Sequence, residues 1–91
     1  MESFWASRAL ADVVRLYEFL ALVNPKAAAQ TVQALTAAPA RLQNSPRIGE
    51  QLDEFAPREV RRILVGRYEM RYEIQESRLY ILRIWHTREH R

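Results

Sequence analysis

Residues 58–91 decide the fold of this chain, and they read REVRRILVGRYEMRYEIQESRLYILRIWHTREHR. Apolar and charged side chains alternate over residues 68–74, and this period of two is typical of a β-strand with one buried face. The inward positions are Tyr68, Met70, Tyr72 and Ile74. Gly66-Arg67 and residues 75–78 interrupt the pattern as turns do, so the segment predicts three consecutive antiparallel strands.

The same segment holds nine of the chain's fourteen basic residues and three of its four tyrosines. A basic, aromatic sheet on a chain of 91 residues favours contact with a charged macromolecule over a buried metabolite. Arg83 lies in the apolar run LYILRIW, where an unpartnered charge is costly, so we expect it to pair with an acid or line a site. Arg71 and its charged neighbours are equally consistent with simple cross-strand ion pairs on a solvent-exposed face.

Residues before this segment predict two helices. Residues 7–23 place apolar side chains on one half of a helical wheel and Asp12 among charged residues on the other, with Phe19 as an exception on the charged side. Asn24 is the expected N-cap of a second helix that begins at Pro25. Pro39 is expected to kink or stop that helix.

The remaining pieces complete the architecture. Residues 3–5 predict one short strand, and residues 47–57 predict a surface connection. We therefore expect an α+β fold in which an N-terminal helical hairpin packs on a small antiparallel sheet of three to four strands. The length predicts a single domain over residues 1–91.

The sequence lacks the residues that several kinds of catalytic or binding site require. The chain has no cysteine and only two glycines, so it carries no thiolate site and no glycine-rich phosphate loop. His86 and His90 lack a third metal ligand. We expect no metal, no cofactor and no small-molecule catalysis. No apolar run approaches the roughly 20 residues of a membrane span, and no signal-peptide pattern begins the chain, so a cytoplasmic protein without a membrane partner is expected.

Some motifs resemble a known family. They are Arg61 five residues before Gly66, the VGRY turn at 65–68, Tyr72, and Ile84-Trp85-His86 followed by Arg88. This pattern, with the helical hairpin before it, resembles the ParE branch of the RelE/ParE toxin superfamily, the plasmid stabilisation toxins. The resemblance implies the toxin of a type II toxin–antitoxin system that arrests growth. ParE-like members are associated with poisoning DNA gyrase, whereas RelE-like members cut mRNA on the ribosome.

Two mechanisms follow from the resemblance. In the first, the chain is not an enzyme but binds gyrase and blocks replication, with target contacts from Arg61, Arg83, His86, Arg88 and Arg91. In the alternative, it is a ribosome-dependent mRNA endoribonuclease in which His86 is the acid or base while Arg61 and Arg83 hold the phosphate. The lone Lys26 and the lack of a tyrosine after Tyr80 favour the first. A third hypothesis is that the chain is a DNA- or RNA-binding module without toxicity.

A toxin of this family also implies a cognate antitoxin as partner. We expect an antitoxin with a DNA-binding N-terminal domain and an acidic, disordered C-terminal segment that folds on the toxin to give a hetero-oligomer. The expected antitoxin-binding residues are Leu16, Phe19, Leu22 and Arg71.

Overall fold

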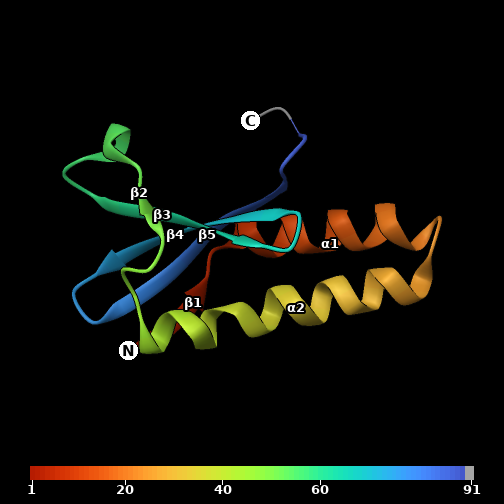
Figure 1. The fold of residues 1–91 in the computed structure, drawn as a ribbon, viewed down its shortest axis with the longest axis horizontal. Helices are drawn as coiled ribbons and strands as arrows, with labels where there is room; N and C mark the ends of the chain where they lie inside the picture. Colours follow the sequence, from red (N-terminus) through yellow and green to blue (C-terminus); the bar gives the residue numbers. More distant parts are fainter. Residues whose placement is uncertain (90–91) are drawn as a thin grey trace.

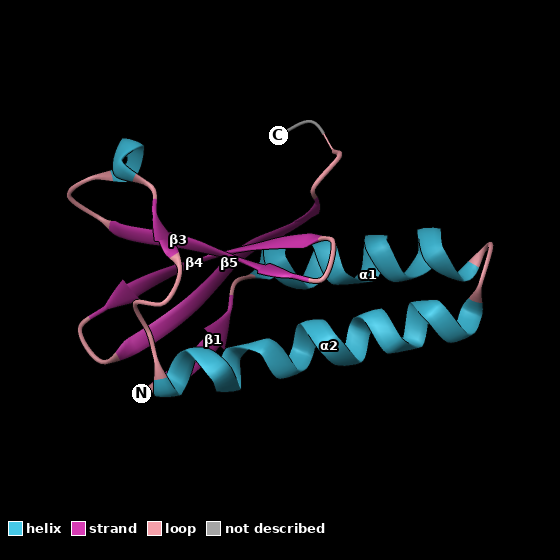
Figure 2. Ribbon diagram, viewed as in Figure 1, coloured by secondary structure: helices cyan, strands magenta, loops and turns pink. Residues whose placement is uncertain are grey.

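The computed structural model describes residues 1–89, in which two helices pack on one face of a five-stranded sheet (Figure 1). The helices are α1 (Ser7–Ala21) and α2 (Pro25–Asn44), with a short 3-10 helix, η1 (Asp53–Phe55). The strands are β1 (Glu2–Trp5), β2 (Glu50–Gln51), β3 (Glu59–Val65), β4 (Tyr68–Gln75) and β5 (Arg78–His86). Figure 2 shows the tip of the helical hairpin extending past the sheet.

The strand order is β1-β5-β4-β3-β2. Strands β3, β4 and β5 form the predicted antiparallel meander, and β1 adds in parallel to β5. The α+β prediction is confirmed, although the sheet is mixed and has one strand more than expected. The extra strand, β2, lies in the segment predicted as a surface connection. Two polar residues are too few to produce an alternating pattern, and the strand forms because β3 offers it an edge.

The helical hairpin begins its second helix as predicted. The Asn24 Oδ1 accepts a hydrogen bond from the Ala27 N–H at 3.1 Å, and Pro25 follows at the first helical position. Pro39 does not stop α2, which continues to Asn44, so that part of the prediction is wrong. A proline costs a helix one hydrogen bond, and the burial of Pro39 with its neighbours Ala38 and Leu42 offsets that loss.

The core lies between the sheet and the helices. The inward set of β4 is confirmed, since Met70, Tyr72 and Ile74 are buried and Tyr68 packs against the core. Helices α1 and α2 contribute Ala9, Leu16, Leu35, Ala38 and Leu42.

The orientation predicted for α1 is wrong in detail. Leu10 and Val14, which fall on the apolar half of the helical wheel, are 52% and 56% exposed, while Asp12 is only 4% exposed. The buried stripe of α1 consists of Ala9, Asp12 and Leu16, because α1 packs along β5 beyond the end of β1. A polar side chain is needed there, since β1 no longer supplies hydrogen-bond acceptors to β5.

Candidate functional site

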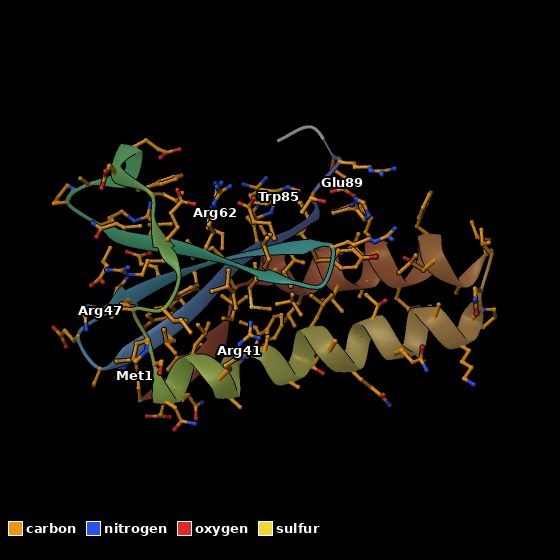
Figure 3. The ribbon with its side chains drawn as sticks, in the orientation of Figure 1. Met1, Arg41, Arg47, Arg62, Trp85 and Glu89 are labelled. Carbon is orange, nitrogen blue, oxygen red and sulfur yellow. The ribbon has the colours of Figure 1, made fainter. Side chains whose placement is uncertain are left out.

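A row of three arginines crosses the sheet face that points away from the helical core. Arg62 on β3 is the register partner of Arg71 on β4, and Arg71 is the partner of Arg83 on β5. Side chains directly opposite one another on adjacent strands are about 5 Å apart at Cβ, so like charges there repel. This face also carries Trp85, which pairs with Glu69. Figure 3 shows Arg62 and Trp85 above the strands and Arg41 below them, beside α2.

Carboxylates neutralise the two ends of this arginine row. The Arg62 Nε donates to Glu50 at 2.7 Å, and its Nη1 donates to Glu69 at 3.2 Å. At the other end, the Arg83 Nε donates to Asp12 Oδ2 at 2.8 Å. The expectation that Arg83 pairs with an acid is therefore confirmed.

The middle arginine is held differently. The Arg71 guanidinium lies 4.7 Å from the centre of the Trp85 ring and 5.1 Å from that of Phe55. It donates one long hydrogen bond to Glu69, at 3.4 Å. Within the described part of the chain, its buried Nε–H has no hydrogen-bond partner. Burial lowers the pKa of Arg71, and the charges of Arg62 and Arg83 lower it further.

Asp12 joins α1 to this face. Burial raises the pKa of Asp12, but hydrogen bonds from Arg83 and the Ile84 N–H, with the charges of Arg83 and Arg15, hold it below its ordinary value. The Ile84 N–H donates to Asp12 at 2.8 Å, just beyond the last pairing of β1 with β5 at Ile81. Asp12 therefore replaces a strand as the acceptor at this edge.

A second feature is a groove of about 810 Å³ between α1, the β3–β4 turn and the C-terminal tail. Its lining residues are Arg15, Leu16, Phe19, Leu20, Arg67, Tyr68, His86, Arg88 and Glu89. Apolar side chains come from the helix, and cationic side chains come from both sides. The groove therefore fits a segment with apolar and acidic side chains.

Hydrogen bonds and an ion pair hold the tail that borders this groove. The Arg15 Nη1 donates to Glu89 Oε1 at 2.7 Å, which ties the tail to α1. The His86 Nδ1 accepts the Arg88 N–H at 3.1 Å, and the His86 ring lies edge-on to Tyr68. The Arg88 side chain is exposed and forms no ion pair within residues 1–89.

The expected target-binding residues do not all come together. His86 and Arg88 share the groove, whereas Arg83 is on the arginine row. The Arg61 side chain is only 14% exposed and bonds to Glu59 and to the Gly49 carbonyl. Arg61 is the register partner of Tyr72, so it extends to the sheet face opposite Arg83. Arg91 lies outside the described residues.

The expected antitoxin-binding residues also divide into two groups. Phe19 is 69% exposed at the groove, Leu16 is buried at its base, and Leu22 is exposed at the tip of the hairpin. Arg71 lies on the arginine row instead. Sequence reasoning missed Asp12 and the alignment of Arg62 with Arg71. The signal that could have identified Asp12 is its position as an acid in the first helix, together with the expectation that Arg83 pairs with an acid.

The described residues hold no group of three or more potential metal ligands among histidine, aspartate and glutamate side chains. No helix in residues 1–89 is long and apolar enough to cross a membrane.

Comparison with solved structures defines the fold class. A chain from the chromosomal ParDE toxin–antitoxin system of P. aeruginosa matches with a TM-score of 0.77 and 23% sequence identity, and the match covers 92% of each chain. A search of curated proteins gave no match.

The family follows from the sequence itself. A family model described as the ParE toxin of the type II toxin–antitoxin system parDE matches residues 4–91. The chain belongs to this family of ParE toxins. The resemblance seen in the VGRY turn and the Ile84-Trp85-His86 ending is thereby confirmed.

Proposed function

We propose that this toxin arrests growth by binding DNA gyrase and blocking replication, without catalysing a reaction itself. The observation that carries this proposal is the separation of the alternative nuclease set. Arg61 and Arg83 extend to opposite sheet faces, and each is engaged by carboxylates or carbonyls. A catalytic group must lie within about 3 Å of the atom it serves, so these two side chains are poorly placed to share one phosphate.

Exposed arginines beside the C-terminal tail favour the groove as the surface that contacts the target. Arg88 and Arg67 line the groove beside His86, and neither arginine has an ion pair in the part of the chain that the structure describes. Unpaired, exposed cations retain their full charge toward a partner and increase the rate of encounter with an acidic surface. We assign target contact first to His86 and Arg88, and also to Arg91, which lies outside the described residues. Arg83 and Arg61 contribute by holding β5 and β3 in position.

The test is a gyrase assay with the purified chain. We expect loss of supercoiling and accumulation of cleaved DNA, with Arg88→Ala weaker than the unchanged protein by about tenfold. Arg8→Ala is the matched control, because Arg8 is an exposed arginine on α1 outside the groove. Unchanged supercoiling at large excess of toxin contradicts the proposal. Cleavage of mRNA on translating ribosomes that is lost in His86→Ala supports the nuclease alternative instead.

We also propose that a cognate antitoxin silences the toxin by laying an amphipathic, acidic segment in the groove. Phe19 provides exposed apolar area there, and Arg15, Arg67 and Arg88 provide positive charge. Leu22 adds exposed apolar area at the tip of the hairpin. Apolar anchors supply affinity, and the surrounding charges select an acidic partner. Leu16 shapes the base of the groove. The antitoxin brings the DNA-binding domain, and the two chains form a hetero-oligomer.

A further inference from the structure

His86 is the first residue of the turn that begins the C-terminal tail, and the backbone of that turn holds its ring. The Glu89 N–H donates to the His86 carbonyl at 2.9 Å, which closes a four-residue turn over residues 86–89. Within this turn the Arg88 N–H donates to His86 Nδ1 at 3.1 Å. Aspartate and asparagine side chains at the first position of a turn accept the N–H two residues on, and His86 Nδ1 does the same. The turn therefore fixes the ring through its Nδ1 atom.

The β3–β4 turn and the start of β4 hold the same ring from the other direction. The Thr87 N–H donates to the Arg67 carbonyl at 2.9 Å, which keeps the start of the tail beside the β3–β4 turn. The His86 and Tyr68 rings are perpendicular, with 5.3 Å between their centres. Aromatic pairs in this arrangement are favourable beyond the area that they bury. The position of the imidazole is therefore determined by both the tail and the sheet.

The bond to Nδ1 determines where the proton of the neutral ring lies. A neutral imidazole carries one proton, and the nitrogen that accepts a hydrogen bond is the one without it. His86 therefore carries its proton on Nε2. Within residues 1–89 this Nε2 has no hydrogen-bond partner and is not buried, so it is open to solvent. Because His86 lines the groove, the ring offers a donor to whatever binds there.

This arrangement does not suit His86 to the role of acid or base. A general base needs a free lone pair, whereas the lone pair of the His86 ring already accepts the Arg88 N–H. Protonation of Nδ1 places two N–H groups against each other and opens the turn. The Nε2–H of a neutral imidazole is a hydrogen-bond donor and not a proton source near neutral pH.

The surroundings of the Nε2–H favour a carboxylate on a peptide. Arg67 and Arg88 line the same groove, and neither forms an ion pair within the described residues. Glu89 is the one acid among the lining residues in the described part of the chain, and it is paired with Arg15. Hydrogen bonds to an ionised acceptor are the stronger ones, and the two unpaired cations attract such an acceptor. Phe19 from α1 suits a peptide with apolar side chains and not a phosphate backbone.

We propose that His86 is a hydrogen-bond donor, held in its Nε2–H form by the Arg88 N–H, and that a carboxylate of the acidic antitoxin segment accepts this Nε2–H. The inference rests on the proposed antitoxin partnership, because the acidic segment belongs to the antitoxin. It gives His86 a binding role in place of the acid or base role of the nuclease alternative.

The first experiment uses the toxin alone, labelled with nitrogen-15, at a pH above about 8 where histidine is neutral. The variant His90→Gln leaves His86 as the one histidine of the sequence. Two-bond NMR correlations within the ring identify the protonated nitrogen, and a scalar coupling across the hydrogen bond joins the Arg88 amide nitrogen to His86 Nδ1. We expect the proton on Nε2 and a measurable coupling. A proton on Nδ1, or no coupling, overturns the proposal.

The second experiment measures antitoxin affinity by calorimetry with two matched variants. His86→Asn keeps an acceptor near the Nδ1 position but removes the donor, whereas His86→Gln places an N–H donor near the Nε2 position. We expect His86→Asn to weaken binding about tenfold or more, and His86→Gln to stay within about threefold of the unchanged toxin. Unchanged affinity of His86→Asn, or equal losses in the two variants, overturns the donor role. Circular dichroism establishes that both variants are folded.

The two experiments separate this inference from the proposed function. The coupling between Arg88 and His86 involves neither antitoxin nor gyrase. Absence of antitoxin binding by the unchanged toxin, with the coupling present, contradicts the partnership and supports the assigned form of the ring. A single-stranded oligonucleotide that shifts the Nε2 resonance at lower concentration than the antitoxin overturns the carboxylate assignment in favour of a phosphate.

Discussion

Asp12 on α1 and Arg83 on β5 form a two-point ion pair, with Nε to Oδ2 at 2.8 Å and Nη2 to Oδ1 at 3.2 Å. The same Asp12 Oδ2 accepts the Ile84 N–H at 2.8 Å. One buried carboxylate thus positions the first helix against the last strand. It also anchors one end of the arginine row, so the stability of the fold and the geometry of the candidate site depend on the same residue.

Removing this carboxylate is expected to destabilise the protein strongly. Asp12→Ala leaves the Arg83 guanidinium and the Ile84 N–H without their acceptor, and we expect a loss of about 2–4 kcal/mol in the free energy of unfolding. Urea denaturation measures it. Glu18→Ala, an exposed acid on the same helix, is the control and is expected to change stability by less than about 0.5 kcal/mol. Equal effects of the two substitutions contradict the assigned role.

Stability is expected to fall in acid. A hydrogen bond from Arg58 lowers the pKa of Glu73, a hydrogen bond from Arg47 lowers that of Glu59, and the pKa of Asp12 is also below its ordinary value. Groups with lowered folded pKa bind fewer protons in the native state. Their stabilisation is therefore complete above about pH 5 and is lost as the pH falls through the lowered values.

Urea unfolding between about pH 2 and pH 7 checks this sign. Glu73→Gln removes one of the three groups, so its stability is expected to decline less steeply below about pH 4. A variant whose acid slope equals that of the unchanged protein argues against the contribution of Glu73.

The position of the loop before β2 is expected to depend on the hydroxyl group of Tyr72. The Tyr72 hydroxyl donates to the Pro46 carbonyl at 2.7 Å and accepts the Gly49 N–H at 3.1 Å. Tyr72→Phe keeps the buried ring but removes both bonds, and we expect it to cost about 1–2 kcal/mol in thermal or urea unfolding. Gln33→Ala, at an exposed position on α2, is the control. Loss of less than about 0.3 kcal/mol in Tyr72→Phe contradicts the anchoring role.

Gly49 is expected to tolerate no side chain. A Cβ at this position lies 2.6 Å from both the Arg62 carbonyl oxygen and the Tyr72 hydroxyl. Gly49→Ala therefore forces the loop away from β3, and we expect a cost of about 1–3 kcal/mol in unfolding experiments. Combining it with Tyr72→Phe should relieve part of the clash, so the double variant loses less than the sum of the two. Strict additivity contradicts this shared contact.

The antitoxin is predicted to bind α1 on the side that carries Phe19 and lines the groove. Phe19→Asp places a charge in the groove, and we expect antitoxin affinity to fall about tenfold or more by calorimetry, with unfolding changed by less than about 1 kcal/mol. Leu10→Asp is the matched control, because Leu10 is an exposed apolar residue on the opposite side of the same helix. If Leu10→Asp weakens binding and Phe19→Asp does not, the antitoxin docks on the other side.

Local pattern was sufficient for most of the architecture. Alternation over β4, the Asn24-Pro25 start of α2 and the Gly66 turn are each specified by residues adjacent in the chain, and all three are confirmed. Residues 65–68 and 84–86 carried the family resemblance. Short-range signals of this kind act through backbone conformation and side-chain period, which do not require the rest of the protein.

Long-range packing decided the rest. Asp12 is buried, although its helix pattern assigns it to solvent, because the end of β1 leaves the Ile84 N–H in need of an acceptor. Arg62, Arg71 and Arg83 form a row only because the bulge between β4 and β5 shifts their register. A charge on one strand carries no information about its neighbour across the sheet. The pairing of strands, and not the order of residues, therefore determined which arginines lie side by side and which acids they bind.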